Sequence, residues 1–549
     1  MTNNNVETAW NYHETTKHSY SSVRTNPHSL DFDNQPLPFK IYPDLELLRM
    51  PNQVQQTGIA ALSAIANTVP IQSTALPDLQ SIAQLLFLSA GITRHRKYSG
   101  GEIYFRAAAC TGALYEIELY LVCGDLPGLK AGIYHFAPAE FGLRNLRDGD
   151  HRGVLAAATG GEPAVAQAPL TVICTATYWR NAWKYQARTY RHFGWDNGTL
   201  LANLLAVATA LGFPAEIVGG FVDSTVNRLL DLDVEREVAF SLVTVGHAAT
   251  LPFQAPLQAE YLAQADALPR LGFETVPISR NEIDYPLMRE MHADSSLDTP
   301  GEVAAWREGK GPVSAISTPS DSPTGVARSQ PPTALRVPLQ PLSDSEMPRD
   351  PIEQVILRRG SSRQFSRTPI SFAQLSTLLD RATRGVPADF LAFDSPASGS
   401  RASRPPHRQP NQLNHLYLIV HAVDGLDPGA YFFDRNADEL ELLKRGDFRD
   451  EAGYLGLEQQ LPADAAVDIF FLADLPPICN RFGNRGYRAV QLEAGIIGGR
   501  LYLAAYAQRL GATGLTFYDD DVTRFFSPHA AGKSAIFLVA IGHSIKRRT

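Results

Sequence analysis

The chain has few cysteines and no long apolar segment, and each of these absences excludes a class of protein. Among 549 residues there are four cysteines, none of them in a Cys-x-x-Cys pair: Cys110, Cys123, Cys174 and Cys479. Neither a disulfide scaffold nor a zinc ribbon is indicated, so a reducing compartment is expected. The longest apolar runs, such as residues 170–179, are too short to span a bilayer, and residues 1–12 lack the apolar core of a signal peptide. We expect a soluble, cytoplasmic protein.

The chain also lacks an excess of positive charge. Its 49 Lys and Arg residues stand against 57 Asp and Glu residues, which gives a formal net charge of −8. No global field therefore attracts nucleic acid or anionic lipid, and neither is expected as a partner. Any anion site must be local.

Motifs for metal, nucleotide and hydrolytic chemistry are missing as well. His13 and His18 lie five positions apart, one more than the spacing of a zinc-binding helix. Gly532-Lys-Ser534 lacks the upstream glycine of a phosphate loop, because Ser527 stands there, and no Gly-x-Ser-x-Gly occurs. The sequence gives no basis for zinc chemistry, ATP use or hydrolysis, and no metal site is expected.

The chain does contain an internal repeat with an offset of 297 residues. Leu119-Tyr-Leu recurs as Leu416-Tyr-Leu, and Gly149-Asp-x-Arg recurs as Gly446-Asp-x-Arg. The same offset relates further pairs without a gap: Tyr134 and Tyr431, Arg188 and Arg485, Tyr190 and Tyr487, Arg191 and Arg488, Gly198 and Gly495. Ordered matches of this kind indicate a tandem duplication. Two homologous lobes can pack as a covalent pseudo-dimer with a ligand cleft between them, and the repeated Tyr-Arg pairs are expected to brace that interface or the helix that follows them.

A proline-rich segment separates the two copies. Residues 311–350 interleave proline with serine and threonine and show no hydrophobic period, which is typical of a semi-extended linker. We therefore divide the chain into a first domain over residues 11–250, an extension and linker over 251–350, and a second domain over 351–549. Residues 252–291 fit either an extension of the first domain or an arm.

Each copy mixes strand hairpins with helices. Residues 119–122 and 416–420 are short β-forming runs followed by glycine-rich turns and a second such run. Residues 200–211 and 496–510 are rich in Ala and Leu and end at glycine, as buried helices do. Without regular βαβ alternation, this order predicts an α+β fold, with two tandem lobes that each hold a mainly antiparallel sheet flanked by helices.

A basic cluster opens the second copy. The run Arg358-Arg-Gly-Ser-Ser-Arg363 places three guanidinium groups and two hydroxyls within six residues, a combination suited to a phosphate dianion. A solvated basic stretch is the alternative. Lys546 and Arg547, near the C-terminus, either join the same anion or belong to a tail.

Several motifs in order carry a family resemblance. Arg-Arg-x-Ser-x-Arg-x-Phe365, a later Tyr487-Arg-x4-Glu-x-Gly495 and a buried Ala/Leu helix ending at Leu-Gly together resemble the nitroreductase superfamily. Residues 12–19 and 37–43, Arg106 followed by Gly-Ala-Leu-Tyr115, and Lys184-Tyr-x2-Arg-x-Tyr-Arg191 are similar to the SagB/ThcOx-type dehydrogenases. The resemblance covers both lobes but not the linker.

This resemblance implies an FMN-dependent oxidoreductase with the flavin at the interface of the lobes. The family's Lys-Tyr pair falls on Lys184 and Tyr185, the candidate catalytic acid and base, which lobe two replaces with Arg481-Phe482. Glu493, like Asp196, either contacts flavin or caps its helix. The candidate flavin-binding residues are Arg106, Arg358, Arg359, Ser361, Arg363, Glu493, Gly495, Lys546 and Arg547. Where the family commonly has Pro-Ser, this chain has Ala109-Cys110, read as a buried structural cysteine.

Three functions stay open at this point. Family members that act on azoline-bearing peptides oxidise thiazoline or oxazoline rings, so the first is a dehydrogenase for such a peptide or a related intermediate, working beside biosynthetic partner enzymes. A base for the proton and flavin N5 for the hydride would suffice. The second is an NAD(P)H-dependent nitro or quinone reductase. The third is a degenerate, non-catalytic scaffold that binds peptide or flavin.

Overall fold

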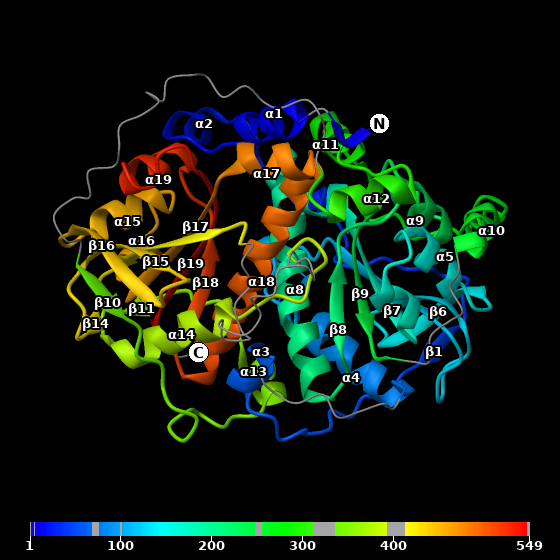
Figure 1. Cartoon of the computed structure of the whole chain (residues 1–549), viewed down its shortest axis with the longest axis horizontal. Coiled ribbons are helices and arrows are strands. Elements are labelled where there is room, and N and C mark those ends of the chain that lie inside the picture. The colour runs from blue at the N-terminus through cyan, green and yellow to red at the C-terminus, as the bar shows by residue number, and fades with distance from the viewer. Residues whose placement is uncertain are drawn as a thin grey trace.

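Two lobes lie on either side of a central pair of long helices (Figure 1). The computed structural model describes residues 2–4, 6–67, 76–98, 101–247, 255–310, 335–391 and 412–545. We call the residues up to 247 lobe one, residues 255–310 the connecting segment and the residues from 335 lobe two. The predicted α+β fold with two tandem lobes packed as a pseudo-dimer is confirmed.

Lobe one is built on an antiparallel sheet of seven strands in the order β1-β6-β5-β4-β7-β9-β8. The central strands β4 and β7 are mainly apolar and are buried along their whole length. The strand bounds are β1 Leu47–Arg49, β4 Ile117–Cys123, β5 Gly132–Ala137, β6 Gly142–Asp148, β7 Leu170–Thr177, β8 Ala215–Val218 and β9 Glu237–Val245.

Lobe two repeats this order in its own sheet, β16-β15-β13-β17-β19 with β18 beside β19. Two edge strands extend it, β11 on β19 and β10 on β16. Strand β10 comes from residues that the sequence assigns to the linker. The bounds are β10 Arg336–Pro338, β11 Phe365–Ser366, β13 His415–Val420, β15 Gly429–Asp434, β16 Glu439–Arg445, β17 Val467–Ala473, β18 Gly511–Leu515 and β19 Ser534–Ser544.

Helices cover both faces of each sheet, and two small sheets of two strands complete the fold: β2 Ile92–Tyr98 with β3 Gly101–Arg106, and β12 Ile370–Ser371 with β14 Val423–Asp424. No helix of the described ranges is both long and apolar enough to cross a membrane. The helices are α1 Glu7–Thr15, α2 Tyr20–Thr25, α3 Ala61–Ile65, α4 Leu79–Ala90, α5 Arg152–Ala158, α6 Pro163–Gln167, α7 Tyr178–Tyr185, α8 Thr189–Ala210, α9 Asp223–Leu229, α10 Ala255–Asp266, α11 Pro286–Asp294, α12 Pro300–Arg307, α13 Ile352–Arg358, α14 Phe372–Thr383, α15 Arg449–Leu455, α16 Gln460–Asp464, α17 Leu475–Phe482, α18 Arg485–Ala507 and α19 Asp519–Phe526.

The central helices α8 and α18 hold the lobes together through glycines (Figure 1). A Cβ atom on Gly198 would lie 2.5 Å from the carbonyl carbon of Gly495, and one on Gly499 would lie 2.6 Å from the Cβ of Ala202. Both contacts join positions that are 297 residues apart. Equivalent positions meet along a pair of helices only when the helices run parallel about a two-fold axis. The duplication has therefore produced a pseudo-two-fold interface within one chain.

The connecting segment contains a further repeat that the single offset of 297 does not reveal. Arg191 of α8 donates from Nη2 to the carbonyl oxygen of His13 in α1 at 2.6 Å. Its counterpart Arg488 of α18 donates in the same way to the carbonyl oxygen of His292 in α11 at 3.0 Å. Helix α11 is therefore the counterpart of α1 at an offset of 279 residues. A division at residue 250 leaves this helix in the extension.

Candidate functional site

The seam between the lobes brings together residues that the sequence selects separately. Helix α7 of lobe one ends with Lys184 and Tyr185, and the Lys184 ammonium lies 5.3 Å from the Tyr185 ring centroid. Partial burial lowers the pKa of Lys184, and the positive charge of Arg363 in lobe two lowers it further. Arg363 thus acts across the seam on the proposed base, and the two lobes contribute different groups to one site.

Tyr185 is held in a tight place beside a glycine. A Cβ atom on Gly112 would lie 3.1 Å from the Tyr185 hydroxyl, and Gly112 has a φ of +64°, so only glycine suits this turn. The ring of His192 meets that of Tyr185 edge-on at 4.6 Å. Burial, and after it the negative charge of Asp196, raises the pKa of the Tyr185 hydroxyl above its ordinary value. The hydroxyl is therefore protonated at neutral pH and available as a hydrogen-bond donor.

A thiol and two carboxyl groups lie behind this tyrosine. The Cys110 Sγ is 3.3 Å from Asp196 Oδ2 and 3.5 Å from Glu116 Oε2. Burial, and then the Asp196 charge, raises the pKa of the Cys110 thiol well above its ordinary value. Burial and the neighbouring Glu116 raise the pKa of Asp196 in the same way. The thiol of Cys110 is therefore protonated at neutral pH, but the residue is half-buried and not fully buried as the sequence predicts.

Asp196 and Glu493 play the same structural part in their own lobes. Asp196 accepts hydrogen bonds from the Thr111 amide at 2.9 Å, in the loop that precedes β4. Glu493 accepts from the Leu413 amide at 3.1 Å and the Asn414 amide at 2.9 Å, just before β13. Both carboxylates lie in mid-helix, so the alternative that they cap their helices is wrong. They anchor the loop that leads into the central strand of each sheet.

The basic cluster of lobe two divides into members with different surroundings. Arg358 is engaged locally, where its Nη2 meets Asp350 Oδ2 at 2.5 Å and donates to the carbonyl oxygen of Tyr506 at 2.8 Å. Arg359 is buried and crosses the seam, donating from Nε to the carbonyl oxygen of Ala107 at 3.0 Å. In the described part of the chain, no carboxylate forms an ion pair with Arg359. A cation left uncompensated at such a depth favours an anion beside it.

Two serine hydroxyls and a further cation follow Arg359 in the chain. The Ser361 hydroxyl is 3.3 Å from that of Tyr502, and the buried Ser362 hydroxyl has no hydrogen-bond partner. The Arg363 side chain is exposed and forms no ion pair with a described residue. Arg106 lies on the other side of the seam, with its guanidinium 5.1 Å from the Tyr115 ring centroid and a hydrogen bond to the Pro38 carbonyl.

The remaining sequence candidates are placed differently. Gly495 lies in the α8–α18 crossing, where a Cβ would be 2.6 Å from the Gly194 carbonyl oxygen, so helix packing by itself accounts for this glycine. Lys546 and Arg547 lie outside the described residues, as does the basic loop around residues 398–406.

Two buried ion clusters, whose acidic members the sequence does not single out, connect the lobes. Asp519 at the start of α19 receives Arg188 Nη1 at 3.0 Å and Arg191 Nη1 at 2.6 Å from lobe one. Asp223 at the start of α9 receives Arg485 Nη1 at 2.6 Å and Arg488 Nη1 at 2.9 Å from lobe two. The expectation that the repeated arginines brace the interface is confirmed. A shared Phe-x-Asp, at residues 221–223 and 517–519, is the signal that identifies both acids.

Comparisons with known proteins agree with this architecture. A solved structure from Anabaena variabilis, described as a nitroreductase, superposes with a TM-score of 0.71 at 25% identity and covers 98% of this chain and 99% of its own. A protein of Methanocaldococcus jannaschii, also described as a nitroreductase, is 27% identical over 168 residues, which cover 31% of this chain and 80% of that protein.

Two relatives carry names from peptide processing. The trifolitoxin-processing protein TfxB of Rhizobium leguminosarum is 29% identical over 27% of this chain and 41% of its own length. The microcin B17-processing protein McbC of Escherichia coli is 26% identical over 23% of this chain and 48% of its own length. The similarity thus spans less than half of either relative.

The family model gives the assignment. The model of the nitroreductase family matches residues 82–247 and again residues 356–543, one match in each lobe. Because the two matches together span more than half of the sequence, this chain belongs to the nitroreductase family and carries two copies of its domain.

Proposed function

We propose that this oxidoreductase is an FMN-dependent dehydrogenase that oxidises an azoline ring in a modified peptide. The observation that carries the proposal is the seam itself, where Lys184 and Tyr185 of lobe one lie within electrostatic reach of Arg363 of lobe two. One side of the seam offers acid–base groups, and the other offers uncompensated cations. Substrate oxidation by a bound phosphate-bearing cofactor needs both.

The residues of lobe two fit the phosphate of FMN. Arg359 is buried and forms no ion pair with a described carboxylate, and the exposed Arg363 forms none either. The Ser361 hydroxyl is 3.3 Å from the hydroxyl of Tyr502, and the Arg359 guanidinium lies 5.9 Å from the Tyr502 ring centroid. Arginine forks and hydroxyl donors together satisfy a phosphate dianion. We assign the phosphate to Arg359, Ser361 and Arg363, with Arg106 facing them across the seam. Bound there, FMN would supply the hydride acceptor.

The residues of lobe one supply proton chemistry. Converting a thiazoline to a thiazole removes a proton and a hydride from adjacent ring atoms. Burial and the neighbouring Arg363 cation lower the pKa of Lys184, which favours the neutral amine that a base needs. We assign the removal of the ring proton to Lys184, whose Nζ would accept it. The neutral Tyr185 hydroxyl is assigned to orient the substrate by a hydrogen bond.

The class of substrate rests on the named relatives. TfxB and McbC are described as processing proteins for trifolitoxin and microcin B17. The similarity to a protein described as a nitroreductase favours a second candidate, an NAD(P)H-dependent nitro or quinone reductase. The two differ in what they need, since only the second consumes a nicotinamide.

Lys184→Ala tests the proposal, and Arg481→Ala is its control because Arg481 stands at the pseudo-equivalent position in lobe two. We expect Lys184→Ala to retain flavin and lose at least about 100-fold in the rate of thiazoline oxidation, the usual contribution of a general base. Arg481→Ala should keep the wild-type rate. The readout is the loss of two hydrogen masses from a thiazoline peptide. Full turnover by Lys184→Ala contradicts the assignment of the base, and nicotinamide-driven nitro reduction without thiazoline oxidation favours the second candidate.

A further inference from the structure

A duplicated chain has two positions where the proposed flavin site could stand. The pseudo-two-fold axis relates Lys184 and Tyr185 to Arg481 and Phe482. It also relates the Phe517 turn that follows β18 to the Phe221 turn that follows β8. We call the position around Phe482 and the Phe221 turn the counterpart site. What fills this site decides how many flavins the chain binds.

We propose that the chain binds one flavin rather than two, because Asp389 of lobe two and Trp306 of the connecting segment occupy the counterpart site and lock the lobes there. This inference rests on the proposed function, since it presumes that FMN binds at the seam beside Lys184.

Asp389 takes the backbone donors of the counterpart site. Its Oδ1 accepts from the Gly219 amide at 2.8 Å and its Oδ2 from the Gly220 amide at 2.9 Å. The backbone on either side is paired as well, because the Ile217 amide donates to the Pro387 carbonyl at 2.8 Å and the Asp389 amide to the Ile217 carbonyl at 3.0 Å. Lobe two thus adds a short parallel segment to the edge strand β8 of lobe one. Aligning Phe221 with Phe517 places Thr516 opposite Gly220, and within the described ranges the Thr516 amide forms no backbone hydrogen bond outside the strand ladders.

Trp306 fills the space in front of these glycines. Cβ atoms on Gly219 and Gly220 would lie 3.2 and 3.0 Å from its indole ring, so the ring rests directly on the backbone. The same ring lies 5.8 Å from the Phe482 ring and 6.5 Å from the Phe390 ring, centroid to centroid. Trp306 is 3% exposed and Asp389 is 2% exposed, which leaves no accessible surface for a planar ligand.

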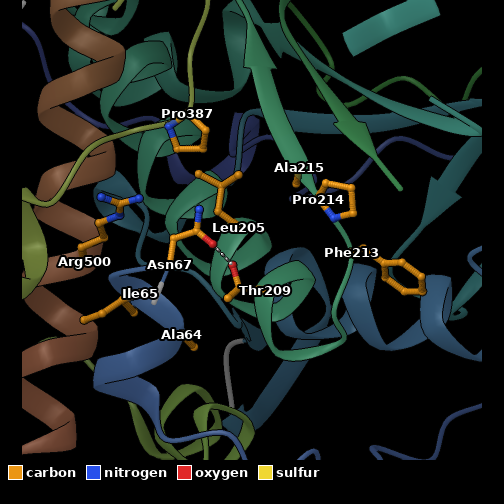
Figure 2. Close-up of a pocket in the computed structure, with 10 residues that line it drawn as sticks. All are labelled: Ala64, Ile65, Asn67, Leu205, Thr209, Phe213, Pro214, Ala215, Pro387 and Arg500. Carbon is orange, nitrogen blue, oxygen red and sulfur yellow. Dashed lines mark hydrogen bonds between the residues drawn. The ribbon is translucent and has the colours of Figure 1, made fainter. Parts of the chain in front are cut away.

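The phosphate side of the counterpart site lacks cations from lobe one. Residues 50–93, which contain the counterpart of the Arg358–Arg363 run, include neither lysine nor arginine. Leu205 and Thr209 stand where lobe two has Tyr502 and Tyr506, and their smaller side chains leave a cavity of about 90 Å³ (Figure 2). One cation lines it, Arg500 of lobe two.

Arg500 is already engaged. Figure 2 shows it opposite Leu205 and Thr209, and its guanidinium donates to the carbonyl oxygens of Arg384 and Gly385. Those carbonyls follow the C-terminal end of α14, where a cation is favourable. The counterpart site therefore lacks the basic cluster that would bind an FMN phosphate. Trp306 fills the space that a flavin ring would need, and Asp389 accepts the hydrogen bonds of the backbone amides.

The stoichiometry of FMN binding to the wild-type chain tests the inference. Apo-protein is titrated with FMN and the bound flavin is counted by absorbance against protein concentration. We expect one FMN per chain. Two per chain overturns the inference while leaving the proposed function intact, and none per chain overturns the proposed function itself.

Substitutions on the two sides then locate the single site. Trp306→Ala should leave the stoichiometry at one and the affinity for FMN within a few-fold of wild type, whereas Arg359→Ala with Arg363→Ala should abolish binding. Loss of FMN in a folded Trp306→Ala variant, with binding kept in the double arginine variant, overturns the assignment. Should Trp306→Ala not fold, Trp306→Phe keeps an aromatic ring in the packing and serves the same comparison.

Discussion

At the scale of single residues, the site depends on what lies beside Lys184. Burial and the Arg363 charge both lower the pKa of its ammonium group, and they come from different lobes. Lys184, Tyr185 and Arg363 could be predicted as site residues from the sequence, because each lies in a recognisable motif. The sequence could not show that they meet. Nor could it identify Asp389 or Trp306, whose roles arise from contacts with residues far away in the chain.

The pH dependence of turnover should report this interaction. A base must be deprotonated, so activity rises as pH rises through the pKa of Lys184. Arg363→Gln removes a positive charge that lowers this pKa, so the rising limb should move to higher pH. Arg363→Lys keeps the charge and should keep the limb in place. The profiles are measured at saturating FMN, and an identical limb in wild type and Arg363→Gln would show that Arg363 does not act on the base.

At the scale of elements, the two long helices determine how the lobes fit together. Their apolar character could be predicted from sequence, but both helices begin 11 residues before the predicted starts at 200 and 496. The glycine stop holds for α8, at Gly212, whereas α18 ends at Ala507 and Gly511 belongs to β18. Strand β10 and helices α11 and α12 could not be predicted from the sequence. The composition of the linker conceals the three-residue edge strand, and α11 matches α1 mainly at His13 and His292. The glycines at the helix crossing are explained by the close approach of the backbones, which a single-chain sequence does not reveal.

Gly198→Ala should destabilise the chain through this crossing. The new Cβ would lie 2.5 Å from the Gly495 backbone, and overpacking of this kind costs about 1–3 kcal/mol. Gly301→Ala is the control, because that glycine lies in the first turn of α12 and a Cβ there would make only an ordinary contact, 3.8 Å from Thr299 Oγ1. The change should be neutral or stabilising by up to about 1 kcal/mol. Denaturant unfolding measures both variants. Equal stability of the two would mean that the crossing tolerates a methyl group.

At the scale of the whole molecule, two buried Arg–Asp–Arg clusters join the lobes. Burial by itself would raise the pKa of Asp519, but the charges of Arg188 and Arg191 prevail and hold it well below its ordinary value. The stabilisation from Asp519 is therefore fully present above the unfolded pKa of about 3.9 and is lost as the pH falls toward the folded value. The repeated arginines could be predicted as braces, whereas their acids lie more than 250 residues away from them in the sequence.

Asp519→Asn should lower the free energy of unfolding by about 3–5 kcal/mol at neutral pH, because it leaves two buried guanidinium groups without their charge partner. The deficit should shrink in acid, where the wild-type carboxylate is itself protonated. Asp520→Asn, at the exposed neighbour that pairs with Lys17 at 2.8 Å, should change stability by about 1 kcal/mol or less. Urea unfolding between neutral and acidic pH measures both, and a small, pH-independent effect of Asp519→Asn would contradict the role given to this cluster.

The central claim, a flavin mononucleotide held by its phosphate at the seam, is tested most directly by the visible absorbance of the protein after mixing with FMN or riboflavin and gel filtration. We expect the flavin band to travel with the protein after FMN and to be lost after riboflavin, which has the same ring but no phosphate for Arg359 and Arg363. A protein that emerges colourless from both mixtures, or that keeps both flavins equally well, would contradict the account.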